Sequence, residues 1–433
     1  MIALIKTLQV VLALSLLIFI HELGHFAWAR LFHIKVEKFF LFFDIGGKAL
    51  ARWRWGETEF GIGWLPLGGY CKIAGMIDES LDTEQLRREP LETDFRAHPA
   101  WHRLLVMAGG VLNNFLFAVI AYCFIAGIWG ESFIPNDGSR IYVNELAYDM
   151  GFRTGDRILK LDDFVPEDFG SLQADMVRKD IRKASVLRGN DTLDIYIDHS
   201  MTGEMLNSPM MFDLAIPFVI DSIVPQSPNF GCGLQKGDRI TSIEGTETEW
   251  LQDARKLFSA HRSGTVGVTV SRADTTLSIP VQVDSSGRIG VYMQMPEIRR
   301  RDYTFAQAVP AGFRLTGKMI SGYLSDLRLL VTPSSGAYKS VGSFIAIGQV
   351  FPASWDWFQF MYVLALLSIM LGVMNLIPIP GLDGGHILFT LYEMITGRKP
   401  SDRFLYVAQL IGMFLLIALM MLAFGNDIGR LIH

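Results

Sequence analysis

Cysteine is scarce in this chain, and so is charge of either sign. The 433 residues include three cysteines, Cys71, Cys123 and Cys232, which lie far apart and show no CxxC spacing. This pattern argues against a disulfide framework and against a cysteine-based zinc site. Charged residues make up 19% of the chain, and the formal net charge is −5. Because acidic and basic residues are mixed and no charged tail is present, we expect no nucleic-acid partner.

Hydrophobic residues are abundant instead. They make up 50% of the chain, and the mean hydropathy is positive. No small-residue cleavage site follows the first apolar run, which predicts a retained membrane helix rather than a removed signal peptide. A membrane-spanning helix needs roughly 20 mostly apolar residues. Four segments meet this requirement: 3–32, 103–129, 357–377 and 404–424.

The segment between the second and third spans has a different character. Residues 131–300 are polar and contain short runs of alternating apolar residues at 193–198, 266–270 and 279–283. Alternation with a period of two is typical of half-buried β-strands. Residues 304–330 follow as an amphipathic helical pattern, which is compatible with a helix on the membrane surface or with one packed on the β-rich region.

This β-rich region also repeats itself. GFRTGDRILKLDD at 151–163 matches GLQKGDRITSIEG at 233–245. In both copies Gly-Asp favours a turn, and the isoleucine that follows favours the start of a strand. Two related domains of about 80–85 residues are therefore expected, and their pattern resembles bacterial PDZ domains. Two unrelated β-rich domains remain the alternative.

The basic residues indicate how the spans are oriented. The short loop between the last two spans contains Arg398, Lys399 and Arg403, and with four spans it lies on the same side as the loop after the first span. The positive-inside rule makes this side cytoplasmic. The repeated domains are then expected outside, which in a bacterium is the periplasm. The basic residues of the first loop are Arg30, Lys35, Lys38, Lys48, Arg52, Arg54, Lys72, Arg87, Arg88, Arg96 and Arg103.

A first group of reactive residues ends the first span as His21-Glu22-Leu23-Gly24-His25. Residues four apart lie on one face of a helix, so His21 and His25 can bind one metal ion. Glu22 is placed to act as a general base on water at that metal. Buried in an apolar helix, these side chains cost several kcal/mol unless they are paired or bind metal. The alternative is that they lie just past the span, in headgroup water.

A second group ends the third span as NLIPIPGLDGG at 375–385. Its two prolines interrupt the helix and leave Asp383 on irregular backbone at membrane depth, which is tolerated only where it is buried in protein or lines a cavity. His21, His25 and Asp383 then provide three ligands, the number typical of a catalytic Zn²⁺ site with one open position. The alternative for Asp383 is a simple helix cap after the proline loop.

These two motifs in this order resemble the site-2 protease family, which comprises M50-type intramembrane zinc metalloproteases. The resemblance covers nearly the whole chain, and the tandem PDZ-like insert is similar to that of the bacterial branch. It implies that His21, His25 and Asp383 are zinc ligands and that Glu22 is the catalytic base. It also implies that Asn375 holds the substrate backbone.

Two further segments share this resemblance. Gly110-Val111-Leu112-Asn113-Asn114 resembles the family's G-x-x-x-N pattern, with Val111 where the family usually has proline. Asn114 is thus a candidate substrate-binding residue or, alternatively, a hydrogen-bonding group between helices. Residues 60–75 resemble the family's membrane-associated β-hairpin, in which Gly68 and Gly69 are candidates to hold an unwound substrate by β-strand addition. A turn-rich loop is the alternative for this segment.

The resulting fold prediction is a polytopic α-helical membrane protein with about four transmembrane helices, a membrane-associated β-hairpin and two inserted PDZ-like β-rich domains. The hairpin belongs to the first part of the membrane core. The predicted divisions are a first membrane part (1–130), two PDZ-like domains (131–215 and 216–298), an amphipathic linker (299–356) and a second membrane part (357–433).

The predicted function is hydrolysis of a peptide bond in the transmembrane segment of a membrane protein by a Zn²⁺-dependent endopeptidase. The expected partners are a single-span membrane protein substrate and the lipid bilayer, and the expected location is the bacterial inner membrane. The resemblance implies a prior cut in the substrate's ectodomain, and an anti-sigma factor and a remnant signal peptide are both compatible substrates. A membrane adaptor and a metal transporter are the competing functions. The PDZ-like domains act either as a size filter or by binding a peptide terminus.

Overall fold

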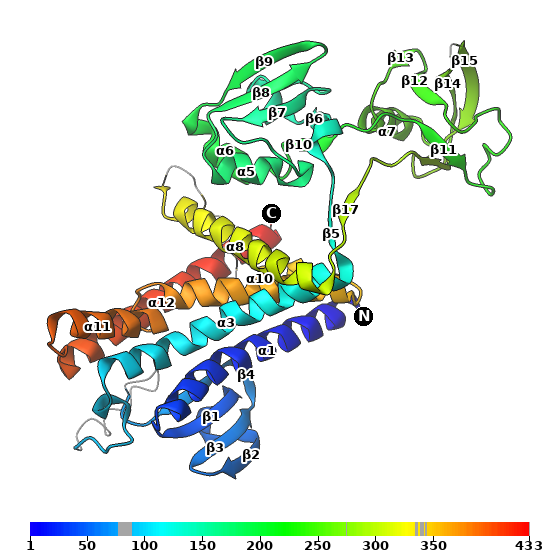
Figure 1. Cartoon of the computed structure of the whole chain (residues 1–433). Helices are drawn as coiled ribbons and strands as arrows, with labels where there is room; N and C mark the ends of the chain where they lie inside the picture. Colours follow the sequence, from blue (N-terminus) through cyan, green and yellow to red (C-terminus); the bar gives the residue numbers. More distant parts are fainter. Residues whose placement is uncertain (77–88, 274, 334–336, 338–341, 343, 433) are drawn as a thin grey trace. The chain divides into compact units, whose positions relative to one another are not determined.

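The computed structural model describes residues 1–76, 89–273, 275–333, 337, 342 and 344–432 (Figure 1). Arg87, Arg88 and part of the predicted linker at 299–356 lie outside these residues. The chain divides into two compact units. The helical unit contains Met1–Glu131, Asp302–Thr332 and the described part of 336–433, and the repeat unit contains Ser132–Arg301.

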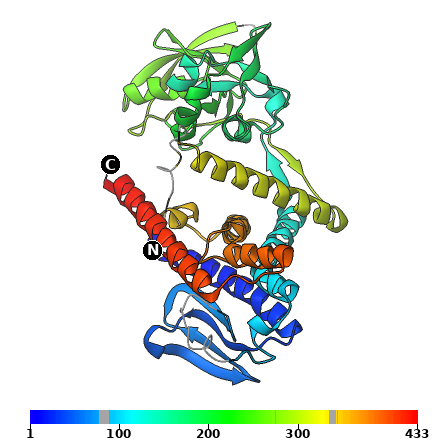
Figure 2. The same ribbon diagram turned by 90° about the vertical axis from the view of Figure 1, so that its left-hand side faces the viewer.

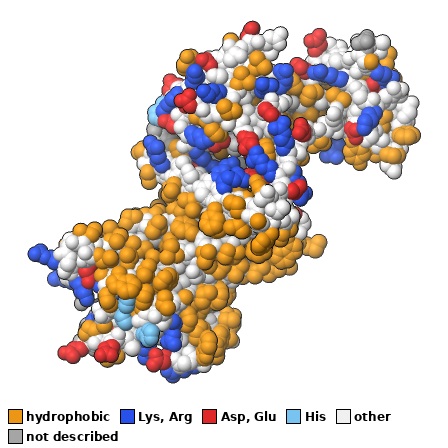
Figure 3. Space-filling model, in the orientation of Figure 1, with side chains coloured by type: hydrophobic (Ala, Val, Ile, Leu, Met, Phe, Trp, Pro, Cys, Tyr) orange, Lys and Arg blue, Asp and Glu red, His pale blue; other side chains and the backbone are white. Residues whose placement is uncertain are grey.

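The four predicted spans are present as long apolar helices of the helical unit. They are α1 (Ile2–Leu31), α3 (Ala100–Trp129), α10 (Trp357–Leu376) and α12 (Asp402–Ile432). At 1.5 Å per residue even the shortest of them is about 30 Å long, which matches the hydrocarbon core of a bilayer. Hydrophobic side chains cover the surface of this unit in Figure 3, as expected for helices that face lipid.

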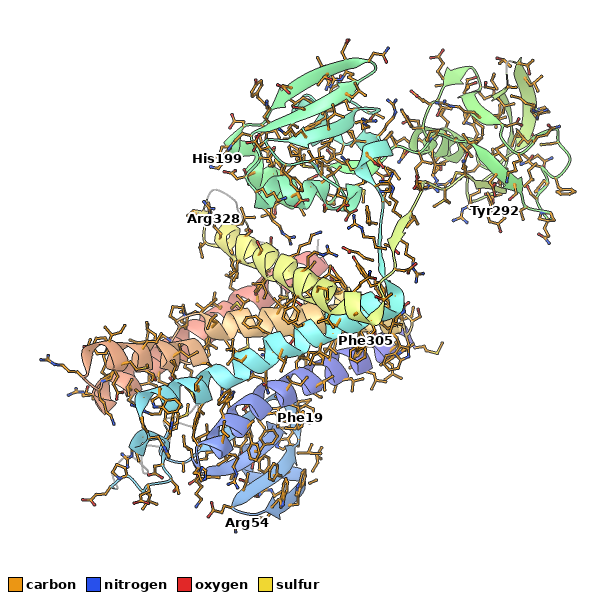
Figure 4. All side chains as sticks on the ribbon, in the orientation of Figure 1. Phe19, Arg54, His199, Tyr292, Phe305 and Arg328 are labelled. Atoms are coloured by element: carbon orange, nitrogen blue, oxygen red, sulfur yellow. The ribbon has the colours of Figure 1, made fainter. Side chains whose placement is uncertain are left out.

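The core of the helical unit forms where α3 packs against α1 on one side and against α10 on the other. Small side chains such as Ala118, Ala121 and Ala365 are fully buried at the α3–α10 contact and allow the two helices to approach closely. The helix predicted at 304–330 is α8 (Phe305–Leu330), whose first residue is labelled in Figure 4. Its apolar face packs on α3 and α10, so α8 belongs to the helical unit.

Shorter helical elements accompany these long helices in the described part of the unit. A short helix, α9 (Phe344–Val350), lies against α1. The helix α11 (Asp383–Thr396) follows α10 after a loop of irregular backbone and contacts α3. Figure 2, turned by 90° about the vertical axis, shows α11 between α3 and α12. Single 3₁₀ turns occur at Ile45–Gly47 and Phe95–Ala97.

A four-stranded sheet lies beside α1 in the order β2-β3-β1-β4. Its strands are β1 (Val36–Phe43), β2 (Ala49–Trp55), β3 (Thr58–Gly63) and β4 (Leu65–Ile73). Phe19 of α1 contacts Phe39 of β1 edge-on, with ring centroids 5.9 Å apart, whereas Arg54 is on β2, at the opposite side of the sheet (Figure 4).

The hairpin predicted at 60–75 takes a different form. Its two strands, β3 and β4, do not pair with each other, because β1 lies between them. β1 pairs with β3 in parallel and with β4 in antiparallel orientation. With a single residue, Trp64, between the two strands, the chain cannot fold back into a directly paired hairpin and instead crosses over β1. The edge of β4 remains unpaired by any strand among the described residues.

The repeat unit contains two small β-rich domains, in agreement with the predicted repetition. The first has two sheets, β6 (Ile141–Val143) with β10 (Phe212–Leu214), and β7 (Arg157–Leu161), β8 (Lys183–Arg188) and β9 (Asp191–Tyr196). The helices α4 (Glu145–Asp149), α5 (Leu172–Arg178) and α6 (Thr202–Asn207) pack with them. Its 3₁₀ turns are Asn136–Gly138, Phe169–Ser171 and His199–Met201.

The second domain has the same kind of architecture. One sheet pairs β11 (Ile220–Ile223) with β16 (Val291–Met293). The other contains β12 (Arg239–Ile243), β13 (Thr246–Glu247), β14 (Thr265–Arg272) and β15 (Thr275–Gln282). Its helix is α7 (Leu251–Ala260), and the connecting strands β5 (Glu131–Phe133) and β17 (Arg299–Arg301) pair with each other.

The Gly-Asp-Arg repeat of the sequence corresponds to a repeated hydrogen-bond arrangement. In the first domain Arg188 donates from Nε and Nη2 to the two carboxylate oxygens of Asp156, both at 2.8 Å. Arg188 also donates to the carbonyl of Gly151, whose φ is +104°. Because Asp156 is only 1% exposed, this two-bond pairing provides the compensation that a buried carboxylate requires.

The second domain contains the same arrangement. Arg272 donates to both oxygens of Asp238 at 2.7 and 2.8 Å and to the carbonyl of Gly233, whose φ is +108°. These bonds hold the pKa of the Asp238 carboxyl below its ordinary value. The matching glycines, carboxylates and arginines indicate that the two domains repeat in structure as well as in sequence.

Candidate metal centre

The helix α1 carries three of the predicted site residues near its C-terminal end. His21 and His25 are separated by one helical turn and are 8% and 6% exposed. Between them, Gly24 lies against the backbone of α3: a Cβ atom at Gly24 would lie 2.2 Å from the carbonyl oxygen of Gly109. This close approach of the two helices requires glycine and brings α3 directly against the histidine pair.

The loop after α10 places Asp383 at the opposite side of the site. α10 ends at Leu376, the two prolines hold residues 377–382 outside helical geometry, and Asp383 is the first residue of α11. A Cβ atom at Gly384 would lie 2.2 Å from the carbonyl oxygen of Ile377. Glycine at this position therefore allows α11 to begin tightly against the loop, which directs the carboxylate toward α1.

The three side chains meet closely. Asp383 Oδ2 lies 3.2 Å from His21 Nε2 and 3.3 Å from His25 Nε2, and the two Nε2 atoms are 3.3 Å apart. A metal with tetrahedral bonds of 2.0–2.1 Å separates its ligand atoms by about 3.3–3.4 Å. The carboxylate oxygen is buried and forms no hydrogen bond of good geometry. The donor set and its spacing thus fit a zinc ion.

Groups from α3 orient the two imidazoles. His25 Nδ1 lies 2.8 Å from the carbonyl oxygen of Val106, so Nδ1 carries the proton and Nε2 keeps its lone pair. His21 Nδ1 lies 3.1 Å from the Asn114 side chain, which is fully buried. Asn114 on α3 therefore contacts His21 on α1. This contact corresponds to the alternative role of Asn114 as a hydrogen-bonding group between helices. Asn375 is half-buried, and its Nδ2 lies 3.3 Å from His21 Nε2.

Glu22 lies between the histidine pair and the edge of the sheet. Its carboxylate is beside His21, His25 and Asp383 and interacts with the backbone N–H of Cys71 in β4. β4 also contains Gly68 and Gly69, and a Cβ atom at Gly69 would lie 2.6 Å from Cγ2 of Ile18 in α1. The two glycines therefore belong to the strand that runs beside the HExxH helix, close to the candidate catalytic residues.

Gly110 leaves the space that the two imidazoles occupy. A Cβ atom at this position would lie 2.5 Å from His25 Nε2 and 2.6 Å from His21 Cε1. We expect Gly110→Ala to push the imidazoles out of place and to weaken zinc affinity by about 10- to 100-fold, as is typical when supporting groups are lost. Zinc content after dialysis against graded chelator measures this effect.

Gly127→Ala is the matched control on the same helix, because its Cβ would meet Ala308 Cβ at an ordinary 3.4 Å. Unchanged zinc affinity in Gly110→Ala would contradict the conclusion that glycine is required at position 110 to accommodate the two imidazoles.

The sequence identified the residues that meet at this site but missed the groups that support them. Val106 acts through its carbonyl and Cys71 through its N–H, and backbone groups have no sequence signal. The contact between Gly24 and Gly109 was also missed, although small residues on neighbouring spans are a signal for close helix packing.

Comparisons with known proteins agree with this geometry. The model for "Peptidase family M50" matches residues 9–419. The regulator of sigma-E protease RseP of Escherichia coli is 29% identical, over 97% of this chain and 98% of its own length. RseP of Salmonella typhimurium is also 29% identical with the same coverage. A zinc metalloprotease candidate from Ralstonia nicotianae is 28% identical over 99% of both chains.

Proposed function

This chain belongs to peptidase family M50 and is an intramembrane zinc metalloprotease, and we propose that it hydrolyses a peptide bond within the transmembrane segment of a single-span membrane protein. The observation that carries this proposal is the meeting of His21 and His25, on a helix long enough to span a bilayer, with Asp383, which follows a second such helix after a short loop. Their three ligand atoms lie within 4.8 Å of one another.

Each residue of the site has a distinct task. His21, His25 and Asp383 hold the ion, and the carbonyl of Val106 and the amide of Asn114 fix the orientation of the imidazoles. Bound zinc supplies a Lewis acid that polarises the peptide carbonyl and makes water more acidic. Glu22 accepts the proton of the attacking water and passes it to the leaving amine. The burial of the site limits bulk water around the reacting groups.

The substrate must be extended where it is cut, because a helix hides its carbonyls in internal hydrogen bonds. The edge of β4 offers a template for this. β4 is an edge strand of the sheet, and Cys71 on this strand lies beside Glu22. In an antiparallel pair alternate residues face the same way, so the N–H and C=O of Gly69 point to the same side as those of Cys71. A substrate strand paired there lies beside the catalytic base, and Asn375 can hold its backbone.

In this proposal the repeat unit selects which substrates reach the metal centre. We place its two PDZ-like domains on the periplasmic side of a bacterial inner membrane, following the distribution of basic residues near the spans. There they act as a filter that admits a substrate only after a first protease has removed its bulky ectodomain. An anti-sigma factor fits this scheme, since two of the relatives are named regulators of sigma-E, and a remnant signal peptide fits it too.

Cleavage of paired substrates tests this proposal. Purified full-length protein in proteoliposomes is given one single-span peptide in two forms, with and without a folded ectodomain. We expect the truncated form to be cut within its span at least about ten times faster, because only this form passes the filter. Mass spectrometry locates the cut. A cut outside the span would overturn the assignment to transmembrane segments, and equal rates for both forms would overturn the filter.

A further inference from the structure

A second polar site lies in the helical unit, separate from the metal centre. It is a cavity of about 120 Å³ among the segment before α3, the helix α11 and the start of α12. Residues that line it include Arg96, Arg103, His386, Glu393, Lys399 and Gln409. None of these six residues belongs to the metal centre or to the candidate substrate-binding residues, so the cavity is a separate feature of this unit.

Positive charge dominates its wall. Three cationic side chains, Arg96, Arg103 and Lys399, oppose one carboxylate, Glu393. Arg103 and Glu393 pair at 2.6 Å, with side chains 11% and 12% exposed, and this buried pair links α3 to α11. Lys399 Nζ donates to the carbonyl of Arg96 at 3.4 Å, which keeps these two residues at the same side of the cavity. The site as a whole is thus suited to an anion.

Gln409 gives independent support for a polar ligand. It lies on α12, one of the helices apolar enough to span a membrane, and is 6% exposed. Its side-chain amide forms no hydrogen bond with any described residue. Because Gln409 lines the cavity, its amide borders a space that a polar ligand can enter. A ligand with hydrogen-bond acceptors would supply the missing partner.

The position of the cavity narrows the choice of anion. It lies where α3 begins at Ala100 and α12 begins at Asp402, so the chain passes there from loop to span. Lys and Arg side chains appear at this end of the helical unit, next to the hydrophobic surface (Figure 3). This is the level at which lipid headgroups lie, and basic pockets between transmembrane helices bind anionic headgroups.

We propose that this cavity binds a phosphate group, either that of an anionic lipid headgroup or a free phosphate ion. Arg96 and Lys399 neutralise its charge, and the amide of Gln409 donates a hydrogen bond to one of its oxygens. The paired Arg103 and Glu393 hold the wall in place. α11 begins with the metal ligand Asp383 and also contains Glu393, which lines the cavity. A bound phosphate therefore also stabilises the position of the helix that carries this ligand.

Binding and thermal stability measured on the full-length protein in neutral detergent test this proposal. The added probes are phosphatidylglycerol, diacylglycerol (which lacks the phosphate) and inorganic phosphate. We expect phosphatidylglycerol to bind and to raise the melting temperature, and diacylglycerol to do neither. Arg96→Gln and Lys399→Gln are each expected to weaken the binding about fivefold, and Gln409→Leu about tenfold.

Arg398→Gln is the matched control, since Arg398 is the neighbour of Lys399, is exposed and does not line the cavity. Binding of inorganic phosphate that is lost in the same variants assigns the site to the free ion, and binding of the lipid alone assigns it to a headgroup. The proposal is overturned if diacylglycerol binds as well as phosphatidylglycerol, if no phosphate-containing probe binds, or if Arg398→Gln weakens binding as much as Lys399→Gln.

Discussion

Glu22→Gln is expected to lower the rate of peptide cleavage by about three orders of magnitude while the protein keeps its zinc. Glutamine has nearly the same shape as glutamate but cannot accept a proton from water. The three ligand atoms belong to other residues and lie within 4.8 Å of one another, so the metal centre stays intact. Single-turnover cleavage of a transmembrane peptide, combined with metal analysis of the same preparation, measures both quantities.

Glu57→Gln, in the exposed turn between β2 and β3, provides the matched control and should leave cleavage unchanged. If Glu22→Gln cleaved the peptide at the normal rate, Glu22 would not be the base. A variant that lost its zinc together with its activity would instead show that Glu22 holds the site together. Metal flux through the membrane that survives in Glu22→Gln would favour the transporter considered as a competing function.

The features that were predicted correctly depend on short stretches of sequence. The four spans follow from the length of apolar runs, and the two histidines share a face because they are four residues apart on one helix. Asp383 was paired with them because a carboxylate on interrupted backbone at membrane depth needs a cation. The structure brings Asp383 Oδ2 to 3.2 Å from His21 Nε2, although more than 300 residues separate them.

The features that were not predicted depend on which segments pair at long range. Residues 60–75 contain strands as expected, but their partner is β1, which is earlier in the chain and intervenes between β3 and β4. Alternation identifies a strand without identifying its neighbour. The role of Gly110 also depends on long-range packing. The glycine was recognised as part of a motif, but its contact with both imidazoles requires the packing of α3 on α1.

Asp383→Asn is expected to weaken zinc affinity by more than the roughly 10- to 100-fold typical of supporting groups, because it removes the charged ligand itself. Asparagine keeps the size of the side chain, so α11 should still begin at this residue, and the change isolates the charge. The histidines alone then provide two of the three protein ligands of a catalytic zinc site. Titration with a zinc chelator measures the affinity, and circular dichroism checks the helices.

Asp356→Asn makes the same chemical change at a position where it should have no effect on zinc. Asp356 caps α10 by accepting the N–H of Gln359 at 2.8 Å, and asparagine caps a helix equally well. Normal zinc affinity in Asp383→Asn would mean that the carboxylate is not a ligand and that the site must recruit its third donor elsewhere. Loss of zinc in Asp383→Asn alone would instead tie the metal to α11, because no other described helix supplies a carboxylate to the histidine pair at ligand distance.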